Sequence, residues 1–164
     1  MKLFGILLVF TACVFGGAAA AERYRALPLG AERAERLVAA MISGIKNEHG
    51  TLDEILRGVL KTDEKTDELV SSVLKSSAGK RIVLKKGEAA KIGFCRDEAA
   101  AALLEEAFEI FGKTAAQEQI KSLEHVREKL AERQSSLSQP CRERAKLACS
   151  FGVIAGFLAA VILI

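Results

Sequence analysis

The chain has 164 residues, half of them apolar, and carries a formal net charge of +3. The apolar residues gather at the ends: residues 1–21 hold 16 of them and one charge, and residues 147–164 hold 15 and no charge. The 125 residues between hold 51 apolar residues, as an ordinary polar domain does. This division disfavours a simple cytosolic enzyme and a disordered chain, and four cysteines are too few for a disulfide scaffold.

The first predicted element is an uncharged helix over residues 3–21, which would span roughly 28 Å, about the thickness of a hydrocarbon core. The same stretch also resembles a cleavable signal peptide, because Ala18, Ala19 and Ala20 form an A-x-A pattern. We favour the membrane helix, because cleavage would require Arg23 and Arg25 to be translocated.

The next elements read as a helical hairpin. An amphipathic helix is predicted by apolar residues on one face, namely Ala34, Leu37, Val38, Met41, Ile42 and Ile45. Pro28 and Gly30 are expected to separate it from the membrane segment, and Gly50 to end it. Thr51 and Glu54 form a capping box at the start of a second helix over residues 52–60.

Further helices are expected over residues 63–75 and 97–111, with irregular structure over residues 87–96. Residues 81–86 are too short to assign and fit either a turn of helix or a strand. From residue 114 a long helix carries a seven-residue repeat, formed by Ala116, Leu123, Leu130 and Leu137. It leads into a second membrane helix over residues 147–164, and Pro140 is expected to kink or interrupt it. The predicted class is all-α: a small helical bundle of helical hairpins over residues 22–146, flanked by transmembrane helices over residues 1–21 and 147–164.

The placement of basic residues predicts the orientation. Lys and Arg near membrane helices mark the cytoplasmic side, and here they gather on the inner flanks of both segments, at Arg23, Arg25, Arg142, Arg144 and Lys146. We therefore expect a cytoplasmic middle domain, with both termini outside. The middle domain is nearly neutral and lacks a basic stripe with aromatics, so nucleic acid is not an expected partner. Membrane lipid is an expected partner, because the juxtamembrane arginines can contact anionic headgroups.

Both membrane segments carry small residues at four-residue spacing, a pattern that lets helix backbones approach closely in lipid. The second segment places them at Ala148, Gly152, Gly156 and Ala160, and the first at Ala12, Gly16 and Ala20. We expect these faces to pack helices together, either with each other or with another protein.

No pattern of catalytic or metal-ligating residues emerges. His49 and His125 are far apart and lack neighbouring cysteines or paired carboxylates, so each is expected to be an exposed helix residue. Cys13, Cys95, Cys141 and Cys149 form no C-x-x-C. Cys13 and Cys149 lie in the membrane segments, and the other two are expected to stay reduced in a cytoplasm. We predict no catalytic residue, no metal and no cofactor.

The chain resembles the stage III sporulation protein AB family of endospore-forming bacteria. The resemblance rests on the start of the first membrane segment, on residues 35–45 with Leu52, Glu54, Ile55 and Leu56, on Phe111-Gly112 with Gln119-Ile120-Lys121, and on residues 150–164. It implies a non-enzymatic component of the channel complex between mother cell and forespore, in the mother-cell membrane around the forespore. Such proteins carry a helical domain similar to type II secretion platforms.

The implied partners are a secretion-type ATPase, stage III sporulation protein AA, and other membrane proteins of the same operon. A cytoplasmic domain agrees with such a partner. The alternative from the residues is a secreted surface protein with a cleaved signal peptide and a C-terminal lipid-anchor signal, in which residues 137–146 form the polar spacer before the hydrophobic tail.

Overall fold

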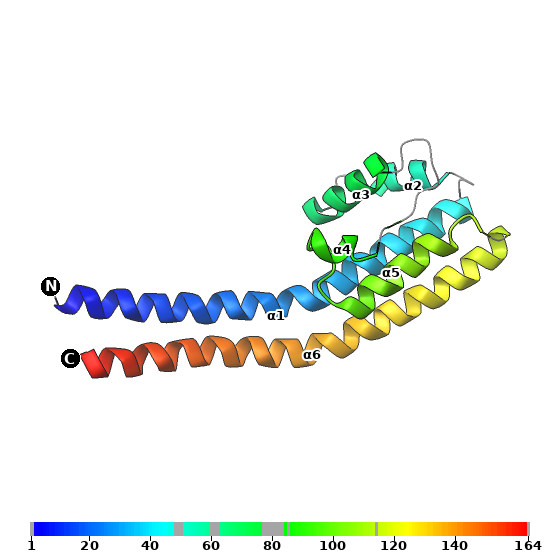
Figure 1. Ribbon diagram of the computed structural model, residues 1–164. Coiled ribbons are helices and arrows are strands. Elements are labelled where there is room, and N and C mark those ends of the chain that lie inside the picture. The colour runs from blue at the N-terminus through cyan, green and yellow to red at the C-terminus, as the bar shows by residue number, and fades with distance from the viewer. Residues whose placement is uncertain are drawn as a thin grey trace. The chain divides into compact units, whose positions relative to one another are not determined.

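The computed structural model describes residues 2–47, 51–59, 63–76, 84, 86–113 and 115–163, which form helices and no strand (Figure 1). The helices are α1 (Lys2–Asn47), α2 (Leu52–Val59), α3 (Glu64–Ser76), α4 (Glu88–Lys91), α5 (Glu98–Ile110) and α6 (Ala116–Leu163). Two compact units emerge: Met1–Leu27 with Ser136–Ile164, called the hairpin below, and Pro28–Ser135, called the domain. The predicted all-α class is confirmed for this part of the chain.

The break predicted at Pro28 and Gly30 is wrong, because α1 is one helix with Pro28 inside it. Proline removes one backbone hydrogen bond, and the strong helix formers on both sides of it sustain the helix. Gly30 serves a different purpose: a Cβ there would lie 3.0 Å from the Cα of Cys95 and 3.2 Å from the carbonyl oxygen of Phe94. The segment after α4 therefore crosses α1 at backbone contact.

Helix α6 likewise continues through Pro140. The two prolines thus lie close to the boundaries between the units, which fall after residues 27 and 135. The predicted boundaries, after residues 21 and 146, followed the change in composition. The hairpin extends further than the second apolar segment because small residues before that segment are also buried, at Cys141 and Ala145.

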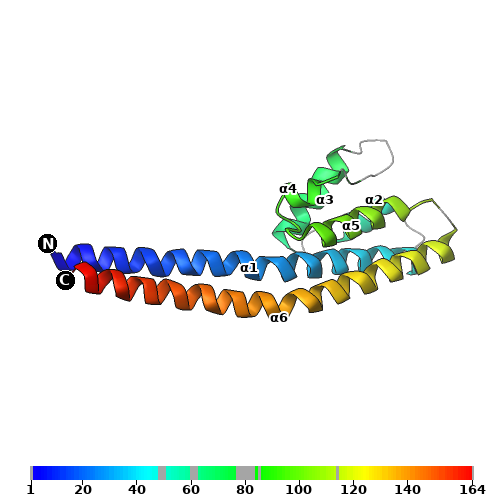
Figure 2. The same ribbon diagram turned by 60° about the horizontal axis from the view of Figure 1, so that its bottom comes forward.

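The core of the domain is built on the predicted apolar face of α1, whose six residues are all buried. Side chains from α2, α3, α5 and α6 complete one cluster with it, including Leu56, Leu69, Leu104 and Leu123. In both views α5 runs beside the domain parts of α1 and α6 (Figures 1 and 2). The predicted pairing of the first two helices is confirmed, since a Cβ on Gly44 would overlap the side chain of Ile55.

Local signals set the helix ends. Glu54 accepts hydrogen bonds from the backbone amide of Thr51 at 2.8 Å and from its hydroxyl at 3.0 Å, so the glutamate arm of the predicted capping box is present. Residues 87–96 were expected to be irregular, but one helical turn, α4, forms there, between Gly87 and Gly93, which both have positive φ. Such backbone suits glycine.

Several expectations lie outside the described residues. They are the helix end at Gly50 and most of the unassigned segment at 81–86, where only Leu84, which is buried, and Lys86, which is exposed, are described. His49 also lies outside the described residues, whereas His125 is exposed on α6, as predicted.

Candidate functional site: an apolar hairpin with a basic collar

The two helices of the hairpin meet at a seam of small residues, and they run antiparallel and side by side in both views (Figure 2). A Cβ on Gly17 would lie 2.8 Å from the carbonyl oxygen of Ala148 and 3.0 Å from the Cα of Gly152. A Cβ on Gly152 would lie 3.0 Å from the carbonyl oxygen of Cys13. The backbones therefore touch, and a larger side chain at either glycine would force them apart.

One turn further, the seam changes to an aromatic contact. A Cβ on Gly156 would lie 2.9 Å from Cδ2 of Phe10, so this glycine makes room for the ring. The same ring meets Phe157 edge to face, with centroids 5.3 Å apart and planes at 76°. This arrangement is favourable for the ring quadrupoles and fixes the register of the hairpin.

The structure places Gly152 and Gly156 at this seam, and Ala148 and Ala160 are half-buried. The face predicted for the first helix is displaced by one residue. A Cβ on Gly16 would meet nothing within 4 Å, Ala12 is exposed and Ala20 is half-buried, while Gly17 makes the contact. Gly16 and Gly17 are equally small, so spacing cannot distinguish them, whereas the fit of Phe10 against Gly156 can.

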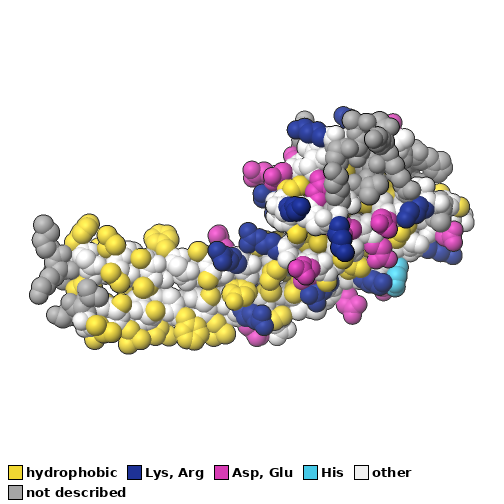
Figure 3. All heavy atoms as spheres, in the orientation of Figure 1, with side chains coloured by type: hydrophobic (Ala, Val, Ile, Leu, Met, Phe, Trp, Pro, Cys, Tyr) yellow, Lys and Arg dark blue, Asp and Glu magenta, His cyan; other side chains and the backbone are white. Residues whose placement is uncertain are grey.

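The outer surface of the hairpin is apolar. Phe15 is 75% exposed and Ile162 is 83% exposed, and the other large exposed residues are Phe4, Leu7, Leu8, Leu147, Phe151, Val153, Ile154, Phe157, Leu158 and Val161. Figure 3 shows many hydrophobic side chains on the visible face of the hairpin. By length and composition, α1 and α6 are each candidates to cross a membrane. The side chains of a soluble protein's core helix would instead be buried.

Where this apolar surface ends, five cations form the basic collar: Arg23, Arg25, Arg142, Arg144 and Lys146. All five are exposed. Because the helices are antiparallel, these residues lie roughly 3 to 12 Å beyond the contact between Gly17 and Ala148, at one level of the hairpin. The half-buried Tyr24, the only tyrosine of a chain without tryptophan, lies in the same band. Aromatic and basic residues are typical of membrane–water interfaces.

In the domain, by contrast, most of the described arginines are paired with carboxylates. The strongest pair joins Arg133 to Asp97, with Nε 3.0 Å from Oδ2 and Nη2 2.9 Å from Oδ1. Asp97 also caps α5 by accepting from the amide of Ala100 at 3.0 Å. The Arg133 guanidinium, together with that amide, holds the pKa of the Asp97 carboxyl below its usual range. This pair ties the start of α5 to α6.

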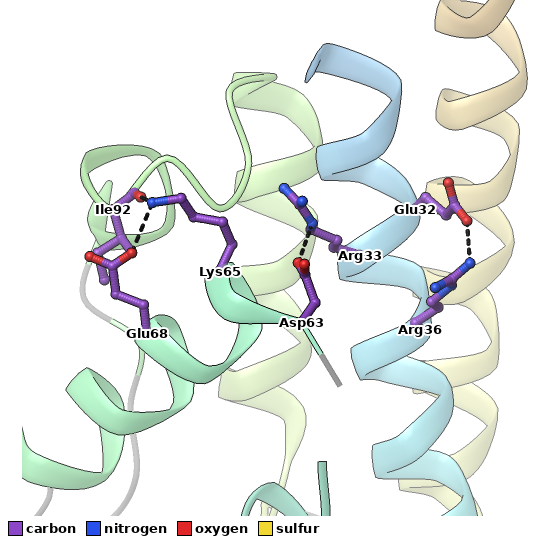
Figure 4. Close-up of polar contacts among 7 residues, drawn as sticks. All are labelled: Glu32, Arg33, Arg36, Asp63, Lys65, Glu68 and Ile92. Atoms are coloured by element: carbon purple, nitrogen blue, oxygen red, sulfur yellow. Dashed lines mark hydrogen bonds and ion pairs between the residues drawn. The ribbon is translucent and has the colours of Figure 1, made fainter. Parts of the chain in front are cut away.

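A groove of about 450 Å³ lies along α1 in the domain. Its apolar lining includes Leu29, Leu37 and Val59, and its charged lining is paired: Arg33 Nε lies 2.6 Å from Asp63 Oδ2, and Arg36 Nη2 lies 2.5 Å from Glu32 Oε1. Figure 4 shows both pairs, with Lys65 bridging Glu68 and the carbonyl of Ile92 beside them. Within its described lining, each of these groove charges has an opposite partner, which favours a structural surface over a catalytic one.

The cysteines are free, and two of them are inaccessible. Cys95 is buried against Gly30, and burial raises the pKa of its thiol to about 11, so it is a poor nucleophile at neutral pH. Cys141 is also buried. Across the part of the chain that the structure describes, no group of three or more His, Cys, Asp or Glu residues is placed to hold a metal ion.

Comparison with protein families gives a match over nearly the whole chain. The family model described as stage III sporulation protein AB covers residues 2–164, which is essentially the whole chain. No curated protein and no solved structure matches the chain significantly.

Proposed function

The chain belongs to the stage III sporulation protein AB family, and from this premise we propose that it is a two-pass membrane component of the sporulation channel complex between mother cell and forespore. In this proposal the hairpin is the anchor, and the domain is a cytoplasmic, non-enzymatic platform for assembly. The protein resides in the mother-cell membrane around the forespore.

The observation that carries the proposal is the inverted construction of the hairpin. Its small residues are inside and its large apolar residues are outside, which is stable only where the surroundings are as apolar as the side chains. The basic collar supports a cytoplasmic domain, because Lys and Arg flank membrane helices on that side. The seam also gives the first segment a structural task, which favours its retention over cleavage as a signal peptide.

The proposed partner of the domain is a secretion-type ATPase, stage III sporulation protein AA, with other membrane proteins of the same complex. A cytoplasmic domain is the part of the chain that such an ATPase could reach. Co-purification of the detergent-solubilised full chain with this ATPase tests the proposal. Failure of the two to associate, both as purified proteins and in sporulating cells, would contradict the platform role while leaving the anchor intact.

Insertion and topology need a dedicated thiol, because Cys95 and Cys141 are buried and stay unlabelled on either side of the membrane. Gln117 is exposed near the start of α6, so Gln117→Cys supplies an accessible thiol in the domain. We expect the chain to resist carbonate extraction, and a membrane-impermeant maleimide to label this variant only after the cells are opened. The native chain is the matched background. Labelling of intact cells would overturn the cytoplasmic assignment.

A further inference from the structure

The arginines of this chain fall into two groups that differ in their partners. In the domain, five of the six described arginines form ion pairs with a carboxylate, the exception being Arg96; the pairs are Arg33–Asp63, Arg36–Glu32, Arg57–Asp53, Arg127–Glu35 and Arg133–Asp97. In the basic collar, none of the four arginines, nor Lys146, forms a side-chain ion pair or hydrogen bond with a described residue. The collar therefore presents cations that the protein itself leaves uncompensated.

The lack of pairing is not caused by a lack of nearby acids. Glu22 lies three residues before Arg25, and Glu143 lies three residues before Lys146. Side chains at this spacing are neighbours on a helix, but neither pair forms an ion pair in the structure. Acids stand four residues away from arginine at two of the domain's pairs, where they do meet. Over residues 22–25 and 142–146 the collar has five cations and two acids, so it keeps an excess of three positive charges.

The position of these cations indicates what they meet. They lie in one band of both helices, where the exposed apolar surface ends. If hydrocarbon covers that surface, this band lies at the depth of the lipid phosphates in a bilayer. A guanidinium matches a phosphate with two parallel hydrogen bonds, and Lys146 adds a point charge. Tyr24 lies in the same band, where an amphipathic ring is favoured.

We propose that the basic collar binds the headgroups of anionic phospholipids of the phosphatidylglycerol class. A zwitterionic headgroup also carries a phosphate, but its own cation compensates the charge, so the excess charge of the collar selects anionic lipid. The inference rests on the membrane insertion proposed above and adds a lipid preference to it.

The test uses the full chain in nanodiscs that contain equal amounts of phosphatidylglycerol and phosphatidylcholine, with retained lipids counted by native mass spectrometry. We expect retention of phosphatidylglycerol over phosphatidylcholine by about tenfold, weakening in high salt. The double variant Arg142→Gln, Arg144→Gln should abolish this preference, because each cation near an anionic surface contributes roughly fivefold and two such contributions together exceed it.

The matched control is Lys121→Gln with Lys129→Gln, which removes two exposed charges from α6 within the domain. This control should keep the native preference. Equal retention of both lipids by the native chain, an equal loss in the control, or displacement of the lipid by inorganic phosphate at the same concentration would each overturn the proposal. A chain that resists carbonate extraction but lacks the preference refutes the collar alone, whereas one that is extracted refutes the anchor.

Discussion

The hairpin and the domain share the helices α1 and α6, but these helices pack by opposite rules in the two units. The domain buries large residues such as Leu37, Leu104 and Phe108, whereas the hairpin exposes residues of the same kind and packs Gly17 against Gly152 at its seam. Burial of apolar area stabilises the domain in water. Between helices in lipid that driving force is missing, and close backbone packing takes its place. One helix can therefore be stable in water along one part and in lipid along another. The condition is that it packs large residues inside in the first part and small residues inside in the second.

The largest expected effect comes from comparing a buried phenylalanine of the domain with an exposed phenylalanine of the hairpin. Phe108→Ala empties a site that is 1% exposed in the domain and should lower the free energy of unfolding by about 3 to 5 kcal/mol. Phe15→Ala, on the outer surface of the hairpin, should lower it by less than about 0.5 kcal/mol. Unfolding followed by far-UV circular dichroism in mild detergent compares the two. Equal losses would mean that Phe15 is packed and would contradict the inverted construction.

The seam is tested by two neighbouring glycines. Gly17→Leu places a side chain where a Cβ already meets backbone at 2.8 Å, so it should destabilise the hairpin by about 1 to 3 kcal/mol. Gly16→Leu points into open space and should be neutral. Spin labels at Leu8 and Leu158, in a background without other cysteines, report the separation of the helices. The distance distribution should broaden for Gly17→Leu alone, and a reversed result would restore the register predicted from spacing.

Removing the ion pair between Asp97 and Arg133 should lower the stability by a smaller amount, because the Arg133 side chain is 42% exposed and solvent weakens the attraction. Asp97→Asn keeps an acceptor for the amide of Ala100 but loses the charge, and should cost about 1 kcal/mol. Asp97→Ala also removes the helix cap and should cost about 1 kcal/mol more. Thermal unfolding of the three chains gives both steps. Identical losses for the two variants would show that the cap contributes nothing.

The same carboxyl predicts a pH dependence. The pKa of Asp97 is lowered in the folded chain, so the unfolded chain binds the proton more readily, and stability is lost as the pH falls below the ordinary carboxyl value near 3.8. Acid unfolding monitored between pH 6 and pH 2 should show this loss in the native chain and a shallower one in Asp97→Asn. Parallel curves would assign the acid sensitivity to other groups.

The success of sequence reasoning follows the same division. In the domain, a six-residue apolar pattern on α1 identified the buried face because only one face could bury those side chains. In the hairpin, composition located the segments, but Gly16 and Gly17 are chemically identical, and the choice between them depends on the fit of Phe10 against Gly156. Pro28 predicted a break because the proline was considered alone, without the helix formers on both sides of it that sustain α1. The basic residues of the collar could be identified from their positions in the sequence, but their lack of ion-pair partners is visible only in the structure.

The smallest expected effect is the difference in stability lost when a paired arginine and an unpaired arginine are each replaced by glutamine. Arg57 lies 2.7 Å from Asp53 one turn earlier on α2, and both are largely exposed, so Arg57→Gln should lower stability by about 0.3 to 0.5 kcal/mol. Arg142 has no such partner among the described residues, so Arg142→Gln in detergent should leave the free energy of unfolding unchanged. A double-mutant cycle with Asp53→Asn isolates the first value. A measurable loss for Arg142→Gln in detergent would mean that the protein itself compensates this cation, and the collar would then have less charge to offer a phospholipid.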